Sequence, residues 1–361
     1  MLIKLLIDKS SRFKENLKLY LSRKLNWPFV APEFFMISLT DNCNLSCKMC
    51  GCAQTAKKYK SQDLSIEEIL NTIEQIGVWT KETEVVFSGG EPFLRNDIFK
   101  LIESVCRKQL KLSINTNGMF IDKNAADRLT SYPVHHMNFS LDGDNPKTND
   151  AIRGQGVFAK VLEGVRFIDQ ARHARNSTFP LISFNVTMMK ENIKGISNFV
   201  SLAKEYNVNN VFFQPVVFDN TNIQADNASI CPDKAQLDEL INILQKVKLE
   251  AQGKGIYVQI PDLHLLREYF TPAKNDGERR KWRCFVGYSR MSISSFGHVY
   301  SCSEKFGEIR ENTLKEIWYS KNAARIRKKF NNCGKFCLQT CYARPDSESL
   351  YNVIRAIFIR K

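Results

Sequence analysis

Residues 34–52 read FFMISLTDNCNLSCKMCGC, an apolar and β-branched run followed at once by cysteines. The run is typical of a buried β-strand, and Cys43, Cys47 and Cys50 follow it with three and then two residues between them. Three thiolates are one fewer than the four that close a structural zinc site or an ordinary cubane, so one iron would keep an open position for chemistry. Cys52 as a fourth ligand would instead make the site closed and structural.

Similar strand signals recur as far as Gln214 and alternate with helix-period stretches, the pattern of βα units in a parallel sheet. Ser65 with Glu68 predicts a capping box at one helix start, and Asp97 precedes another helix. We expect an α/β fold, a partial (βα)6 TIM-like barrel whose active site lies on the loops after the strands. The predicted strands are 34–39, 84–88, 111–115, 137–141, 181–188 and 210–214.

Polar and glycine residues follow the later predicted strands. The second strand ends in VVFSGGEPFLR (85–95), where glycines permit close approach of the backbone and a carboxylate offers acceptors to an ammonium group. The alternative is a glycine turn that begins the next helix, and the later residues could equally be turn or capping residues. The candidates are Gly89, Gly90, Glu91, Thr116, Asn117, Gly118, Ser140, Asp142, Arg153 and Asn185.

The C-x3-C-x2-C spacing, together with the GGE segment, resembles the radical S-adenosylmethionine (SAM) superfamily over roughly residues 34–215. The resemblance implies that SAM binds the open iron of a [4Fe–4S] cluster. Its reductive cleavage then gives a 5′-deoxyadenosyl radical that takes hydrogen from a substrate C–H bond. The resemblance also implies SAM-binding roles for Gly89, Gly90, Glu91, Asn117, Ser140, Asp142, Arg153 and Asn185.

A second set of cysteines lies in the C-terminal part. Twelve residues separate Cys284 from Gly297, and four more precede Cys302, a spacing that resembles the opening of SPASM and twitch auxiliary-cluster domains. RMSISSFGHVYSC (290–302) predicts a β-hairpin that turns at residues 296–297. Two of the later cysteines would join Cys284 and Cys302 around a second [4Fe–4S] cluster, and a structural zinc site is the alternative. The later cysteines are Cys333, Cys337 and Cys341.

The fuller family pattern has seven tail cysteines, and this chain has five, so we expect one auxiliary cluster. Cys106 lies in a helix-period segment and is expected to be a buried thiol, and Cys231 has no ligand-spaced neighbour.

Charge and composition suggest where the protein works. The formal net charge is +14, and no stretch approaches the roughly 18 apolar residues of a membrane span. A lysine-rich chain with clustered cysteines and no secretory signal is expected to be cytoplasmic. Basic residues mixed with apolar ones near both ends predict peripheral contact with the inner, anionic membrane surface, and packing against the barrel is the alternative.

The predicted domains are a basic amphipathic extension (1–30), the radical SAM core (31–230), a helical connection (231–280), a SPASM/twitch-like domain (281–345) and a basic tail (346–361). The expected function is radical oxidation, epimerisation or bond formation on a peptide or on a small-molecule, sugar or lipid-linked substrate. A flavodoxin or ferredoxin would supply electrons. The alternative is a non-catalytic iron–sulfur electron carrier or a nucleic-acid-binding protein, although no nucleic-acid-binding motif is present and no nucleic acid is expected.

Overall fold

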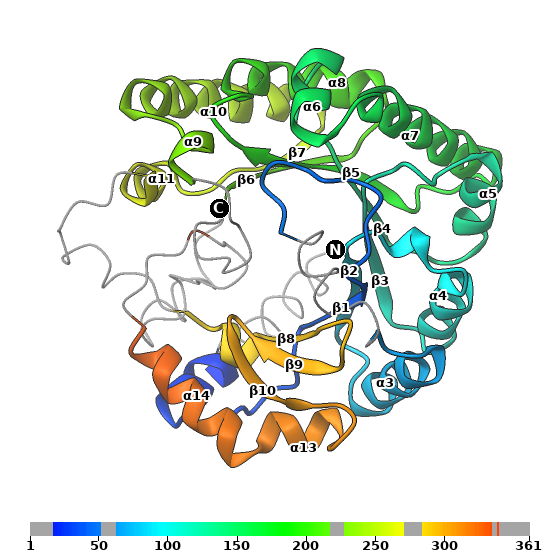
Figure 1. Ribbon diagram of the computed structural model, residues 1–361, viewed down its shortest axis with the longest axis vertical. Coiled ribbons are helices and arrows are strands. Elements are labelled where there is room, and N and C mark those ends of the chain that lie inside the picture. The colour runs from blue at the N-terminus through cyan, green and yellow to red at the C-terminus, as the bar shows by residue number, and fades with distance from the viewer. Residues whose placement is uncertain (1–16, 52–62, 217–226, 271–283, 334–337, 339–361) are drawn as a thin grey trace, which may run out of the picture.

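The computed structural model describes residues 17–51, 63–216, 227–270, 284–333 and 338. Its centre is one ten-stranded sheet with the order β10-β9-β8-β1-β2-β3-β4-β5-β6-β7. The sheet curves into an open ring with the helices outside it (Figure 1). The strands are β1 (Phe34–Thr40), β2 (Glu84–Gly89), β3 (Lys111–Thr116), β4 (His136–Ser140), β5 (Leu181–Met188), β6 (Asn210–Pro215), β7 (Tyr257–Gln259), β8 (Arg290–Ile293), β9 (His298–Ser301) and β10 (Glu304–Glu308).

The six predicted strands are all present as β1 to β6, and each end agrees within one residue. Each pairs in parallel with the next, so the predicted partial barrel of the α/β class is confirmed. Strand β7 was not predicted. Its three residues lie between helices α10 (Lys234–Lys254) and α11 (Leu263–Phe270) and are too few to display a period-two pattern.

Helices cover the outer face of the sheet. At the start of α3, the Glu68 N–H donates to Ser65 Oγ and the Ser65 N–H donates to the Glu68 carboxylate, which confirms the predicted capping box. Helix α4 begins after Asp97, but the Asp97 carboxylate pairs with Arg95 and does not cap the helix. The helices of this part are α3 (Ile66–Trp79), η1 (Pro92–Leu94), α4 (Ile98–Arg107), α5 (Lys123–Ser131), α6 (Pro146–Arg153), α7 (Val157–Ala174), η2 (Ile193–Asn198), α8 (Phe199–Glu205), α9 (Asn227–Ile230), α10 (Lys234–Lys254) and α11 (Leu263–Phe270).

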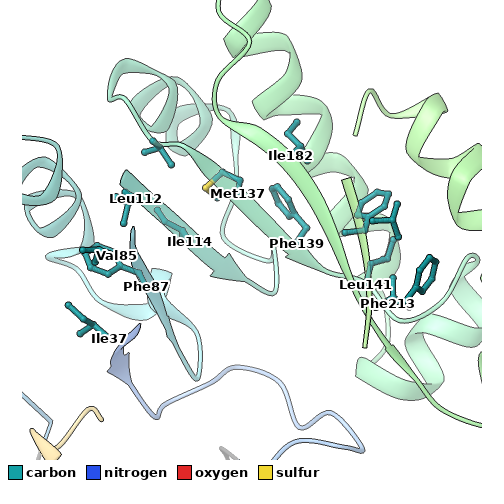
Figure 2. Packing of buried hydrophobic residues seen from close by; sticks show 14 of the residues in the cluster. Ile37, Val85, Phe87, Leu112, Ile114, Met137, Phe139, Leu141, Ile182 and Phe213 are labelled. Carbon is teal, nitrogen blue, oxygen red and sulfur yellow. The ribbon is translucent and has the colours of Figure 1, made fainter. Parts of the chain in front are cut away.

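The hydrophobic core lies between the sheet and these helices, and Figure 2 shows its strand residues. Phe87 and Phe139 are fully buried there. Because side chains alternate along a strand, the residue next to each core residue of a strand points to the opposite face, toward the interior of the ring. Three of these neighbours form a polar row: Asn115 Nδ2 donates to Ser88 Oγ at 3.3 Å, and Asn138 Nδ2 donates to Asn115 Oδ1 at 3.0 Å.

The C-terminal part continues the same sheet. Strands β8 and β9 form the predicted antiparallel hairpin, and Gly297 in its turn has a φ of 89° that favours glycine. Strand β8 also pairs in parallel with β1, from Phe34 opposite Arg290 to Ile37 opposite Ile293. The sheet therefore runs across the predicted domain boundary. The helices of this part are α12 (Val286–Ser289), α13 (Leu314–Tyr319) and α14 (Lys321–Asn331).

The helical residues 17–24 pack against this C-terminal part. Leu19 is fully buried in a cluster with Phe285 and Tyr288, and the Tyr288 hydroxyl donates to Asn26 Oδ1 at 3.0 Å. Residues 17–24 therefore pack against the body of the protein, which was the alternative to membrane contact. None of the helices within the described ranges is both long and apolar enough to cross a membrane.

A chain that ends at Phe270 tests the continuity of the sheet. Removing β8 leaves one edge of β1 unpaired, and removing Trp318 uncovers Trp79, whose ring centroid lies 6.3 Å from it. We expect the thermal midpoint of the iron-free protein, measured by circular dichroism, to fall by about 10 °C or more. A chain that ends at Pro345 serves as the control. Equal midpoints for the two truncated chains would show that the stability of the barrel does not depend on β8 and Trp318.

Candidate active site

The cysteine loop, residues 41–51, leaves the end of β1 and lies against the end of β2. The Gly90 N–H donates to the carbonyl oxygen of Thr40 at 2.7 Å. A Cβ atom on Gly89 would lie 2.3 Å from that same oxygen, and one on Gly90 would lie 2.1 Å from the carbonyl oxygen of Asn42. Gly89 also has a φ of 121°. The two glycines are therefore required for the close approach of these two backbone segments.

Glu91 ties the ends of three strands together. Its N–H donates to the Asn42 carbonyl oxygen at 2.9 Å, and its carboxylate is fully buried. The carboxylate accepts from Phe93 N at 3.1 Å, Thr116 Oγ1 at 2.9 Å and Asn117 N at 2.7 Å. Burial raises the pKa of Glu91, and these three donors oppose the rise. The carboxylate thus accepts hydrogen bonds from within the protein, and its contact with an ammonium group stays a prediction.

Asn117 extends this network to the cysteine loop. Its Nδ2 donates to Asn44 Oδ1 at 2.8 Å and lies 3.7 Å from Cys43 Sγ. Its Oδ1 accepts from Met119 N at 3.0 Å. Because both ends of the amide have partners, the side chain is fixed beside the sulfur atom of Cys43.

Arg153 and Asp142 form a buried ion pair beside Cys47. The Arg153 Nη2 and Asp142 Oδ2 atoms are 2.7 Å apart, and Asp142 also accepts from Thr187 N at 2.6 Å. Arg153 Nη1 lies 3.9 Å from Cys47 Sγ. Asp142 has no solvent-exposed surface, so its carboxylate orients Arg153. The Nε of Arg153 is buried and has no partner within the described part of the chain, which fits an acceptor supplied by a bound ligand.

Ser140 and Asn185 lie opposite each other on the neighbouring strands β4 and β5. They share the interior face of the sheet, since Phe139 and Phe184 occupy the core face. Among the described residues neither side chain has a hydrogen-bond partner, so both present polar groups to the interior of the ring.

The three cysteines of the loop influence one another electrostatically. Burial raises the pKa of the Cys43 thiol, and it raises that of Cys47 to about 11, where Arg153 opposes the rise. A charge on Cys50 raises both values further. Within residues that the structure describes, no three His, Cys, Asp or Glu side chains converge closely enough to bind a single metal ion. Cys52 lies outside those residues.

The C-terminal cysteines that can be placed lie on adjoining segments. Cys302 has a φ of 53° in the turn between β9 and β10, next to Ser301, whose Oγ donates to the Val286 carbonyl oxygen at 2.9 Å. Cys284 lies two residues before Val286, and Cys333 follows α14, which packs on α12. Cys337 and Cys341 lie outside the described residues.

The two remaining cysteines belong to apolar surroundings. Cys106 packs against the main core but is half-buried, where a buried thiol was expected, and burial raises its pKa to about 11. Cys231 packs with Met49 of the cysteine loop in a smaller apolar cluster. Sequence reasoning missed Asn44 and Thr187, which bond to Asn117 and Asp142. No spacing pattern marks a residue whose partner lies on another loop.

Comparison with known proteins agrees with this geometry. Residues 37–203 match the family model of the radical SAM superfamily, and residues 284–342 match that of the SPASM iron–sulfur cluster-binding domain. The chain resembles the structure of Streptococcus suis SuiB bound to precursor peptide SuiA with a TM-score of 0.67 and 17% identity, over 84% of this chain and 68% of that one.

Two curated relatives extend the match along the sequence. An AdoMet-dependent heme synthase of Methanosarcina barkeri is 27% identical over 314 residues, which are 82% of this chain and 84% of the relative. A GTP 3′,8-cyclase of Thermodesulfovibrio yellowstonii is 31% identical over 290 residues, which are 77% and 84% of the two chains. The cofactors are therefore SAM and a [4Fe–4S] cluster, with auxiliary iron–sulfur binding in the C-terminal domain. This chain belongs to the radical SAM superfamily and is an enzyme of SAM-dependent radical chemistry.

Proposed function

We propose that Cys43, Cys47 and Cys50 hold the catalytic [4Fe–4S] cluster and that SAM lies over the interior face of the sheet, beside Ser140 and Asn185. When bound, cluster and SAM supply a radical that takes hydrogen from a substrate C–H bond. The observation that supports this placement best is the set of unpartnered polar groups there. The Ser140 and Asn185 side chains lie on the neighbouring strands β4 and β5, and Arg153, at the end of α6, lies next to Cys47 of the cysteine loop.

The remaining candidate residues have orienting roles in this proposal. Glu91 fixes Asn117 beside Cys43, and Asp142 fixes Arg153 beside Cys47. A guanidinium group near a thiolate or a substrate carboxylate lowers the energy of the negative charge there. Gly89 and Gly90 set the backbone distance between β2 and the cysteine loop. In this proposal the amino group of SAM contacts backbone carbonyl groups of the same segment.

For the auxiliary cluster, we propose four ligands among Cys284, Cys302, Cys333, Cys337 and Cys341. The adjoining positions of the first three support this set. One cluster remains the proposal, with a zinc site as its alternative. The proposed domains are residues 1–30, 31–230, 231–280, 281–345 and 346–361. The shared sheet joins the radical SAM core (31–230) to the SPASM/twitch-like domain (281–345).

For partners, we propose a peptide substrate and a flavodoxin or ferredoxin as electron donor. SuiB, which shares the fold, has been solved with a precursor peptide. The curated relatives are named for heme and for GTP, so a small molecule, including a lipid-linked sugar, is the second candidate. A short reading frame beside the gene would favour a peptide, and a neighbouring glycosyltransferase would favour a lipid-linked sugar.

Replacing Cys43, Cys47 and Cys50 together by Ala should abolish formation of 5′-deoxyadenosine from SAM under dithionite, because no ligand to the catalytic cluster remains. The measurements are chromatographic detection of 5′-deoxyadenosine and iron counting after anaerobic reconstitution. Cys106→Ala is the matched control, since this half-buried thiol packs against the core. SAM cleavage at the wild-type rate in the triple variant would refute the ligand assignment.

The double variant Cys284→Ala with Cys302→Ala should lose the auxiliary iron while retaining SAM binding, because the two cysteine sets are separate. Zinc in place of this iron in the wild-type protein would contradict the auxiliary cluster.

The role of Gly90 gives a further prediction. In Gly90→Ala the new methyl group would overlap the Asn42 carbonyl, which displaces the cysteine loop and costs about 1–3 kcal/mol. We expect most iron to be lost from the catalytic site and the auxiliary iron to remain. Gly253→Ala is the control, because a Cβ there meets no atom within 4 Å and should stabilise α10 by about 0.5–1 kcal/mol. Equal iron contents in the two variants would exclude the steric role of Gly90.

We also propose peripheral contact with an anionic membrane surface. Leu25, Trp27 and Phe29 are exposed to 63%, 46% and 47% in one short segment, next to Lys24. Helix α14 carries basic residues and no acidic one. Aromatic and aliphatic side chains beside basic ones favour an anionic lipid interface, where each basic residue contributes about 1 kcal/mol.

Flotation with anionic vesicles tests this contact. The triple variant Leu25→Ser, Trp27→Ser, Phe29→Ser should bind such vesicles at least about tenfold more weakly than the wild type at low salt. Leu249→Ser is the control, since Leu249 is 70% exposed on α10. No flotation of the wild type at low salt would remove the membrane proposal.

A further inference from the structure

Arg95 lies where the cysteine loop begins and where the chain returns from it. Its Nη1 donates to the carbonyl oxygen of Leu39, at the end of β1, at 3.1 Å. The same nitrogen donates to the carbonyl oxygen of Leu64, just before α3, at 3.0 Å. One guanidinium nitrogen thus joins two backbone positions that bracket all three cysteines of the catalytic set.

Asp97 fixes the guanidinium group in this position. Arg95 Nε donates to Asp97 Oδ1 at 2.8 Å, and Nη2 donates to Oδ2 at 2.6 Å. The Arg95 side chain is only 14% exposed. The paired, planar geometry leaves Nη1 directed at the two carbonyl groups, which a lysine ammonium on a flexible stem cannot reproduce.

Two further contacts close the same place, which we call the neck (Leu39, Thr40, Asp63 and Leu64). Thr40 Oγ1 donates to Asp63 Oδ2 at 2.7 Å. The Leu64 N–H donates to the carbonyl oxygen of Ser295, in the turn of the β8–β9 hairpin, at 2.6 Å. The Arg95 side chain bonds to both sides of the neck, at Leu39 and at Leu64.

We propose that Arg95 is a positioning residue that closes the neck, so that the three thiols are held in register before the catalytic cluster assembles. Closing a loop in advance removes part of the entropy lost when its ligands converge on one cluster. Retention of the catalytic cluster therefore depends on Arg95, and retention of the auxiliary cluster does not, since the Arg95 side chain bonds to Asp97 and to Leu39 and Leu64, which flank the catalytic cysteines. This inference rests on the proposed ligand set for the catalytic cluster.

The test compares Arg95→Gln, Arg95→Lys and Asp97→Asn in the full chain after anaerobic reconstitution. Iron release to a chelator is followed over time, and electron paramagnetic resonance with and without SAM separates the catalytic cluster from the auxiliary one. We expect both Arg95 variants to release catalytic iron about tenfold faster or more, and Asp97→Asn to lie between them and the wild type. Auxiliary iron should be released at the wild-type rate in all three.

Arg107→Gln is the matched control, because Arg107 lies on neighbouring α4, is 77% exposed and pairs with Glu103 on the same helix. Circular dichroism of each variant, together with the auxiliary signal, reports whether the fold is retained. If Arg95→Gln releases catalytic iron at the wild-type rate, the inference is overturned. It is also overturned if iron release is accelerated equally at both clusters, because that result indicates general destabilisation. If the wild type itself shows no SAM-sensitive cluster signal, the proposed ligand set fails first.

Discussion

The close approach of the first two strand ends is the constraint on which this site depends. Neighbouring parallel strands usually diverge into loops that fold separately, yet here the backbone bonds continue past the strands. The Gly90 N–H still meets the Thr40 carbonyl, and the Glu91 N–H meets that of Asn42. No side chain fits between these segments, because a Cβ on Gly90 would overlap backbone. The start of the cysteine loop is thus set by main-chain contacts.

Two buried carboxylates also help to position the residues beside the cysteines. The carboxylates of Glu91 and Asp142 lie away from water, which costs free energy unless donors surround them. Backbone N–H groups and a guanidinium group supply those donors, and each arrangement carries one polar side chain to a sulfur atom. Asn117 reaches Cys43 and Arg153 reaches Cys47. Hydrogen bonds and positive charge beside sulfur are among the factors that set the potential of an iron–sulfur cluster.

The C-terminal part is joined to this site through the sheet itself. Strand β8 is hydrogen-bonded to β1, the strand that leads into the cysteine loop, and the turn of its hairpin bonds to Leu64 where the chain returns. Paired strands resist relative displacement, because sliding breaks every bond of the ladder. The strand that leads into the loop of Cys43, Cys47 and Cys50 and the hairpin that precedes Cys302 are therefore parts of one continuous sheet.

The sequence alone determined the six barrel strands, the capping box at Ser65, the hairpin at Gly297 and the two sets of cysteines, because these depend on local periodicity, turn chemistry and ligand spacing. It also indicated which strand ends carry polar residues. Only the tertiary structure showed which of those residues have hydrogen-bond partners within the protein, because those partners come from distant segments of the chain. Glu91 and Asp142 look like ligand contacts in sequence, and the structure gives them partners far along the chain, Asn117 after β3 and Thr187 in β5. Pairing of β8 with β1 was likewise not predictable, because hydrogen bonds between distant segments depend on how the folded chain brings them together.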